Sequence, residues 1–131
     1  MRRGRRTAIF PAATLLVSAP ATSPAGGLTT EAGGVKVQVG SQPERPTTGR
    51  KTVYTVRLED PAGTPVSGVK ITLSGRMADG MSVVAPLRAA AEPGTYRGEV
   101  LYTMTGRWDL RVRVAGRSQR FEVPLVEEVD R

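Results

Sequence analysis

The chain has 131 residues, with 19 Lys and Arg against 12 Asp and Glu, and it contains neither Cys nor His. This length is that of one domain. The missing Cys excludes disulfides and thiolate metal sites, and the missing His excludes Ser-His triads and imidazole metal ligands. The formal net charge is +7, but four arginines in the first six residues supply four of these charges. The remainder is only mildly basic, so the charge does not indicate nucleic-acid binding.

Residues 1–25 are predicted to form a signal peptide or N-terminal anchor. A basic start, MRRGRR, precedes a moderately apolar stretch from Ala8 to Ala21 that Pro11 interrupts. Ala19-Pro20-Ala21 fits the small-x-small pattern of a cleavage site. The stretch is short for a membrane span, which favours a removed signal over a permanent anchor. We therefore expect an exported, extracytoplasmic protein (secreted, periplasmic or membrane-tethered), and the alternative interpretation is a disordered cytoplasmic tail.

The rest of the chain is predicted to be all-β. Residues 26–34 are rich in Gly, Thr and Ala and are interpreted as a flexible linker. Residues 35–125 are interpreted as one folded domain, and residues 126–131 as a C-terminal tail. About seven short runs of alternating apolar and polar residues, separated by Gly and Pro, indicate an antiparallel sandwich or barrel. The runs are Val35 to Val39, Thr52 to Leu58, Val69 to Leu73, Val83 to Ala89, Thr95 to Thr103, Arg107 to Val114 and Ser118 to Val123.

The runs from Thr95 to Thr103 and from Arg107 to Val114 are predicted to pair as a hairpin. In both runs the apolar residues have even numbers. Directly opposed antiparallel partners face the same side of a sheet, so the apolar residues of one run can lie opposite those of the other. The predicted register places Tyr102 opposite Trp108. On the other face it places Glu99 opposite Arg111, an opposite-charge pair.

Four motifs together resemble the YtkA-like domain, a relative of the FixH proteins. In chain order they are Asp60-Pro-Ala-Gly-Thr-Pro-Val-Ser-Gly-Val, Met77-x-x-x-Met81, Gly94-Thr-Tyr96 and Met104-Thr-Gly106-Arg-Trp108. The resemblance covers about Val35 to Val123. It implies a single immunoglobulin-like β-sandwich, exported or membrane-tethered, that is associated with copper handling or respiratory oxidase assembly. The chain departs from the family's pattern because it has no His near the Met motif and lacks the transmembrane helix of FixH proteins.

Three methionines beyond the initiator are the candidate metal ligands: Met77, Met81 and Met104. Thioether sulfur is soft and neutral, so it suits Cu(I) and binds Zn, Mg or Ca poorly. Met77 and Met81 flank Asp79-Gly80, a turn that would bring both sulfurs to one side. The alternative is that all three residues fill gaps in the core, as Met often does.

The aromatic and arginine residues of the later runs are given structural interpretations. Tyr96, Tyr102, Trp108 and Phe121 lie on the apolar faces of their runs and are predicted core residues. Arg107, Arg111 and Arg113, joined by Arg97, form a basic stripe on the outward face. We interpret this stripe as a solvated strand face, with docking of an acidic partner or an anionic membrane as the alternative.

No enzymatic activity is expected. The adjacent acids Glu59-Asp60 and Glu127-Glu128 cannot act as converging acid/base pairs, because neighbours on a strand point to opposite faces. No phosphate-binding or nucleophile motif occurs. Two hypotheses remain. The first is an exported accessory domain that hands Cu(I) to a membrane oxidase or efflux partner, and the second is a plain extracytoplasmic protein-interaction module without metal.

Overall fold

The computed structural model describes residues 27–131, and the predicted signal segment, residues 1–25, lies outside the described residues. The described chain consists of eight strands, and every pair of neighbouring strands is antiparallel. The strands are β1 (Gly27–Ala32), β2 (Val35–Gln42), β3 (Lys51–Glu59), β4 (Lys70–Arg76), β5 (Ser82–Ala89), β6 (Thr95–Leu101), β7 (Gly106–Ala115) and β8 (Arg120–Val129).

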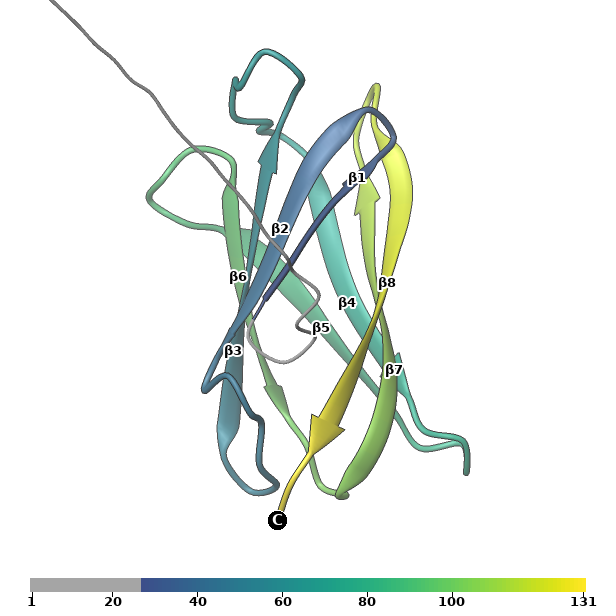
Figure 1. Ribbon diagram of the computed structural model, residues 1–131. Coiled ribbons are helices and arrows are strands. Elements are labelled where there is room, and N and C mark those ends of the chain that lie inside the picture. The colour runs from purple at the N-terminus through teal and green to yellow at the C-terminus, as the bar shows by residue number, and fades with distance from the viewer. Residues whose placement is uncertain (1–26) are drawn as a thin grey trace, which may run out of the picture.

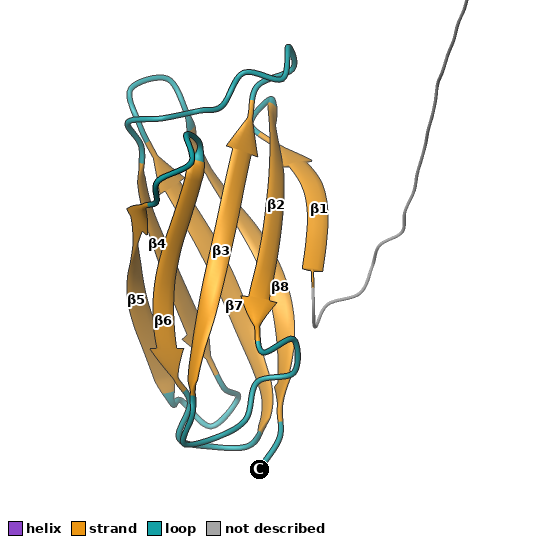
Figure 2. Ribbon diagram, turned by 90° about the vertical axis from the view of Figure 1, so that its left-hand side faces the viewer, coloured by secondary structure: helices purple, strands orange, loops and turns teal. Residues whose placement is uncertain are grey.

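The strands fold into two facing layers (Figures 1 and 2). The hydrogen-bonded order is β1-β2-β3-β6-β5-β4-β7-β8. One layer holds β1, β2, β3 and β6, and the other holds β5, β4, β7 and β8. Strand β5 connects the layers, because it pairs with β4 over six residues and with β6 only through Arg88 and Ala89. The predicted fold class, an immunoglobulin-like antiparallel sandwich, is confirmed, with eight strands in place of about seven.

Side-chain alternation explains why the two layers close on each other. In β7, Trp108, Leu110 and Val112 are buried, while the intervening charged residues are exposed. Successive residues of a strand point to opposite faces, so this pattern gives β7 one apolar face, and that face packs on the opposite layer. Of the predicted core aromatics, Trp108, Tyr102 and Tyr96 are buried and Phe121 is half-buried.

The strands alternate in direction, so the loops gather at the two ends of the sandwich. The C-terminal end carries the β2–β3, β4–β5 and β6–β7 connections together with the C-terminus (Figure 1). The opposite end carries the β3–β4 loop, which is fixed to the sheet because the Tyr96 hydroxyl donates a hydrogen bond to the Val66 carbonyl at 3.0 Å. Two of the motifs seen in the sequence, those containing Met77 and Met104, therefore lie at the C-terminal end.

The prediction that residues 26–34 form a flexible linker is wrong for most of this range. Strand β1 pairs with β2 in register from Gly27↔Gly40 to Ala32↔Val35. The connecting turn uses Gly33 and Gly34, both with positive φ, which glycine adopts without steric cost. The strand escaped sequence reasoning because it is an edge strand whose residues are half-buried or exposed, so its apolar alternation is weak.

The predicted hairpin between β6 and β7 is also wrong. Strand β6 pairs with β3 and β5, whereas β7 pairs with β4 and β8, so the connection between β6 and β7 crosses from one layer to the other. Tyr102 and Trp108 do meet, with ring centroids 5.2 Å apart, but across the core. Glu99 lies opposite Val53 and makes an ion pair with Lys51 at 3.6 Å, far from the predicted partner Arg111.

The predicted tail, residues 126–131, is part of the fold. Strand β8 continues to Val129, which is buried. Beyond the strand, Asp130 donates its N–H to Pro46 at 3.0 Å, and its carbonyl accepts from the N–H of Thr48 at 2.9 Å. These hydrogen bonds attach the chain end to the β2–β3 loop.

Candidate functional site

The structure places Met77 and Met81 directly opposite each other at the end of the β4–β5 hairpin. The last pair of the ladder is Arg76↔Ser82, and the Met77 N–H continues it by donating to the Met81 carbonyl at 2.8 Å. The turn is held by the Asp79 side chain, whose Oδ1 accepts from the Met81 N–H at 3.0 Å. Opposed residues of an antiparallel pair project to the same side, so both thioethers leave the hairpin on its inward-facing side.

Met104 lies on the connection that passes beside Met77. A Cβ placed on Gly106 would lie 3.1 Å from Met77 Cε, so the Met77 side chain rests against the β6–β7 connection two residues after Met104. The backbone of Met104 is itself fixed, because Trp108 Nε1 donates to its carbonyl at 3.1 Å. The fold therefore gathers all three candidate methionines at the C-terminal end. We call Met77, Met81 and Met104 the methionine cluster.

The methionine cluster combines a supported member with two accessible members. Met77 is half-buried and packs on the hydrophobic core, whereas Met81 is 41% and Met104 42% exposed. Within residues 27–131 no group of three or more His, Cys, Asp or Glu side chains is placed to hold a metal ion. A donor set made of thioethers alone fits Cu(I), which accepts soft neutral ligands, and does not fit Zn²⁺, Mg²⁺ or Ca²⁺.

A buried acid lies in the same half of the sandwich. Glu127 on β8 is 1% exposed, and its Oε2 atom has no hydrogen-bond partner among residues 27–131. Beside it, the hydroxyls of Tyr54 on β3 and Tyr102 after β6 are 2.6 Å apart in the core. Tyr54 and Glu127 also line a small space between β2 and β8, where the two layers meet at their open edge. We call Glu127, Tyr54 and Tyr102 the buried polar cluster.

Burial changes the proton affinities of this cluster. It raises the pKa of the Glu127 carboxyl to about 7, and the nearby Tyr54 hydroxyl opposes that rise. It also raises the pKa of Tyr54 far above the usual value, and neighbouring Tyr102 and Glu127 raise it further. The pKa of Tyr102 is raised by burial as well, while its hydrogen bond with Tyr54 works against the rise. Both tyrosines are therefore neutral near pH 7, and Glu127 titrates there.

The sequence interpretation missed the buried polar cluster because it ended the strand early. The alternation of Val123 and Leu125 continues through Glu127 to Val129, and all four side chains are buried. If the predicted strand had been continued from Val123 by four residues, its alternation would have placed Glu127 on the inward face. The prediction that Glu127 and Glu128 point to opposite faces is confirmed, since Glu128 is exposed.

The predicted basic stripe is only partly one surface. Arg107, Arg111 and Arg113 all lie on the outward face of β7 and are exposed. Arg97 lies on β6, in the other layer, so its inclusion in the stripe is wrong. The error follows from the incorrect β6–β7 hairpin, which would have placed the two strands side by side.

The architecture is that of immunoglobulin-like domains, and a solved structure has the same fold. The chain is similar to the "Crystal structure of the Lin-41 filamin domain", with a TM-score of 0.56 and 18% sequence identity over 72% of this chain and 92% of that one. The likeness at this identity concerns the fold alone. Comparison with curated proteins gives no significant match.

The family model described as YtkA-like matches residues 29–113. This range covers more than half of the chain and includes β2 to β6 and most of β7. The chain belongs to the YtkA-like family. Over residues 27–131, the structure contains no helix of the length and apolarity needed to cross a bilayer.

Proposed function

We propose that this protein is an exported, non-catalytic accessory domain that holds Cu(I) in its methionine cluster. Family membership supports an accessory role, and the basic and apolar pattern of residues 1–25 supports export. The observation that carries the metal assignment is the convergence of two loops at the C-terminal end. Met77 faces the same side as Met81 and touches the connection that carries Met104.

Each member of the cluster has a separate role in this proposal. Met77 is supported by the core and serves as the fixed ligand. Met81 and Met104 are more exposed and can leave the ion as a partner's ligands replace them. Cu(I) requires no proton release from a thioether, so binding at this site is independent of ligand protonation. The domain would pass the ion to a membrane oxidase or efflux system, or assist assembly of the oxidase.

The packing of Met77 favours a second candidate function. Its side chain packs against the core at the turn end of the β4–β5 hairpin, as expected for a methionine that fills an irregular gap. In that case the domain is an extracytoplasmic protein-interaction module without metal, and the methionines are structural.

Cu(I) titration of the full chain under reducing conditions distinguishes the two candidates. We expect saturable binding of one ion, and weakening of at least roughly tenfold, equivalent to about 1.4 kcal/mol, when Met77, Met81 and Met104 are replaced together by Leu. Leu matches Met in volume and lacks the sulfur, so the fold should tolerate the change. Equal binding by the variant would remove the metal assignment and favour the interaction module.

The interpretation of the titration depends on the remaining methionine and on an intact fold. The initiator methionine remains in every variant, so binding that survives the triple replacement would be attributed to it or to oxygen ligands. Thermal unfolding of the triple variant checks that the domain is intact. A single Met104→Leu variant then tests whether the second loop participates, and we expect it to weaken binding without changing the unfolding temperature.

A further inference from the structure

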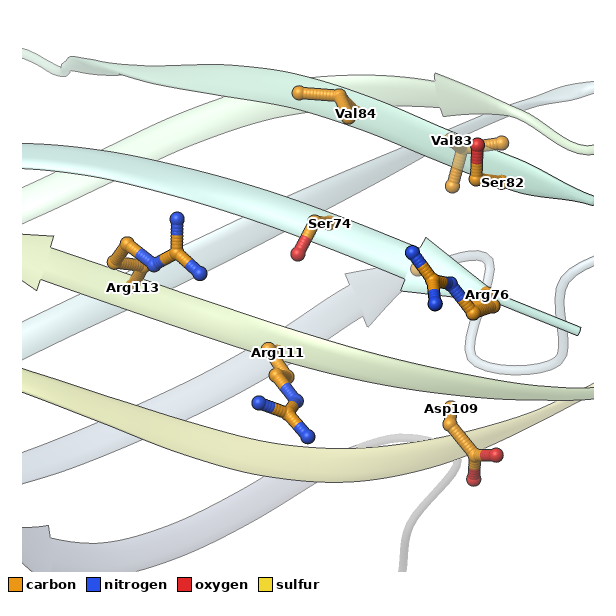
Figure 3. Close-up of a pocket in the computed structure, with 9 residues that line it drawn as sticks. Ser74, Arg76, Ser82, Val83, Val84, Asp109, Arg111 and Arg113 are labelled. Carbon is orange, nitrogen blue, oxygen red and sulfur yellow. The ribbon is translucent and has the colours of Figure 1, made fainter. Parts of the chain in front are cut away.

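The outward face of the β5-β4-β7-β8 layer carries a groove of about 380 Å³ (Figure 3). Its floor follows β4, where the outward side chain at the centre is the small Ser74. Ser74 lies opposite Val84 of β5 on one side and Arg111 of β7 on the other. The centre of the groove is therefore the place where the short Ser74 side chain lies between Val84 and the longer Arg111.

The groove is positively charged because its arginines outnumber their carboxylate partners. Arg111 and Arg113 share a single carboxylate, that of Glu122 on β8, at 3.3 and 2.9 Å. Asp109 at the rim is paired with Arg107 at 3.3 Å. Arg76, at the end of the groove in Figure 3, has no ion pair within residues 27–131. Among the described residues, one groove arginine therefore has no carboxylate partner, and two others share a single carboxylate.

The excess of positive charge extends over the whole outward face of this layer. Strands β5, β4, β7 and β8 carry seven basic and three acidic side chains on that face, whereas the rest of residues 27–131 carries eight basic and nine acidic side chains. The net positive charge of the described residues therefore lies on this face. The charged residues of the face are Lys70, Arg76, Arg88, Arg107, Arg111, Arg113 and Arg120, with Asp109, Glu122 and Glu128.

We propose that this groove binds an extended acidic segment of a partner protein. Arg111 and Arg113 are two residues apart on one strand, about 6.8 Å, which is the spacing of alternate side chains in an extended peptide. Guanidinium groups recognise carboxylates in a fork geometry, and both arginines already bind the Glu122 carboxylate. Val84, which is 70% exposed, and the Ser74 hydroxyl offer contacts that suit a polypeptide better than a free inorganic anion.

A synthetic peptide tests the proposal directly. The probe is a fluorescent peptide of alternating Glu and Thr, about ten residues long, and the neutral comparison replaces each Glu by Gln. We expect the full-length protein to bind the acidic peptide saturably and the neutral one at least roughly tenfold more weakly, because the carboxylate contacts are lost. Added salt should weaken the binding of the acidic peptide.

Two matched variants locate the binding. Arg76→Gln with Arg111→Gln removes two charges from the groove, and Lys36→Gln with Arg97→Gln removes two exposed charges from the other layer. We expect at least roughly tenfold weaker binding only for the groove variant, since exposed substitutions of this kind barely alter stability. The N-terminal arginines are present in every variant, so the difference between variants reports on the groove alone.

Three outcomes would overturn the proposal. The first is an equal loss in both variants, which would mean that net charge alone attracts the peptide. The second is groove-dependent binding of phosphatidylglycerol vesicles or inorganic phosphate without binding of the peptide, which would assign the face to a different anion. The third is the absence of saturable binding to the peptide.

Discussion

At the scale of single residues, Glu127 is the least expected feature of the molecule. Glu127 is 1% exposed, and one of its carboxyl oxygens lacks a hydrogen-bond partner in the part of the chain that the structure describes, so the group is costly to ionise. The nearby Tyr54 hydroxyl favours the carboxylate, but the opposing effect of burial is larger. The protonated form of Glu127 therefore suits its surroundings better than the carboxylate, which accounts for the direction of its pKa shift.

The stability of the protein should fall as the pH rises toward 8. Folding raises the pKa of Glu127 from 4.5 to about 7, so the folded state binds more protons than the unfolded state between these values. The stabilisation is fully present below pH 4.5 and is lost as the pH rises through 7, by on the order of 2–3 kcal/mol. Urea unfolding at several pH values measures this change.

Glu127→Gln is the matched control for that prediction. The amide has the same size and cannot ionise, so we expect its free energy of unfolding to vary less between pH 5 and pH 8 than that of the parent protein. An unchanged pH dependence in the Gln variant would assign the effect to other groups.

The hydroxyl pair of Tyr54 and Tyr102 should show strong energetic coupling. Tyr102→Phe leaves the buried Tyr54 hydroxyl without its partner at 2.6 Å, and we expect a loss of about 1–3 kcal/mol. Replacing both tyrosines by Phe removes the unpaired group, so the double variant should lose less than the two single variants together. Additive losses in a double-mutant cycle by urea unfolding would contradict this account.

At the scale of elements, the end of β8 is part of the sandwich. Deleting residues 126–131 would remove the buried Val129 and both hydrogen bonds of Asp130 to the β2–β3 loop. We expect a loss of on the order of 3–5 kcal/mol in the free energy of unfolding, from lost apolar burial and unmade hydrogen bonds. Deleting Arg131 alone, which is exposed, is the control and should change little. A truncated chain with unchanged stability would show that the C-terminus does not hold this end together.

The elements also show where sequence patterns are informative. Most strands of the core were predictable because apolar and charged residues alternate cleanly in them, as around Trp108 in β7. Strand β1 was not, because an edge strand buries little. The partners of β6 and β7 could not be predicted from the pattern. The apolar residues of both strands have even numbers, and this is expected whether the two strands pair in one sheet or face each other across the core. Tyr102 and Trp108 are in contact in either arrangement.

At the scale of the whole molecule, the proposed copper site depends on which loops the fold gathers at one end. The sequence placed Met77 and Met81 on one turn but could not place Met104, since its position depends on the crossing between layers. The buried polar cluster was equally inaccessible, because its members come from β3, β8 and the end of β6. Long-range geometry of this kind follows from topology, and local periodicity does not contain it.

X-ray absorption at the copper edge would show whether the methionine cluster binds Cu(I) as proposed. For the Cu(I)-loaded full chain we predict a first coordination shell of sulfur, which Met77→Leu, Met81→Leu and Met104→Leu together abolish. A first shell made only of oxygen or nitrogen in the parent protein, or a sulfur shell that persists in the triple variant, would show that the methionine cluster is not the Cu(I) site.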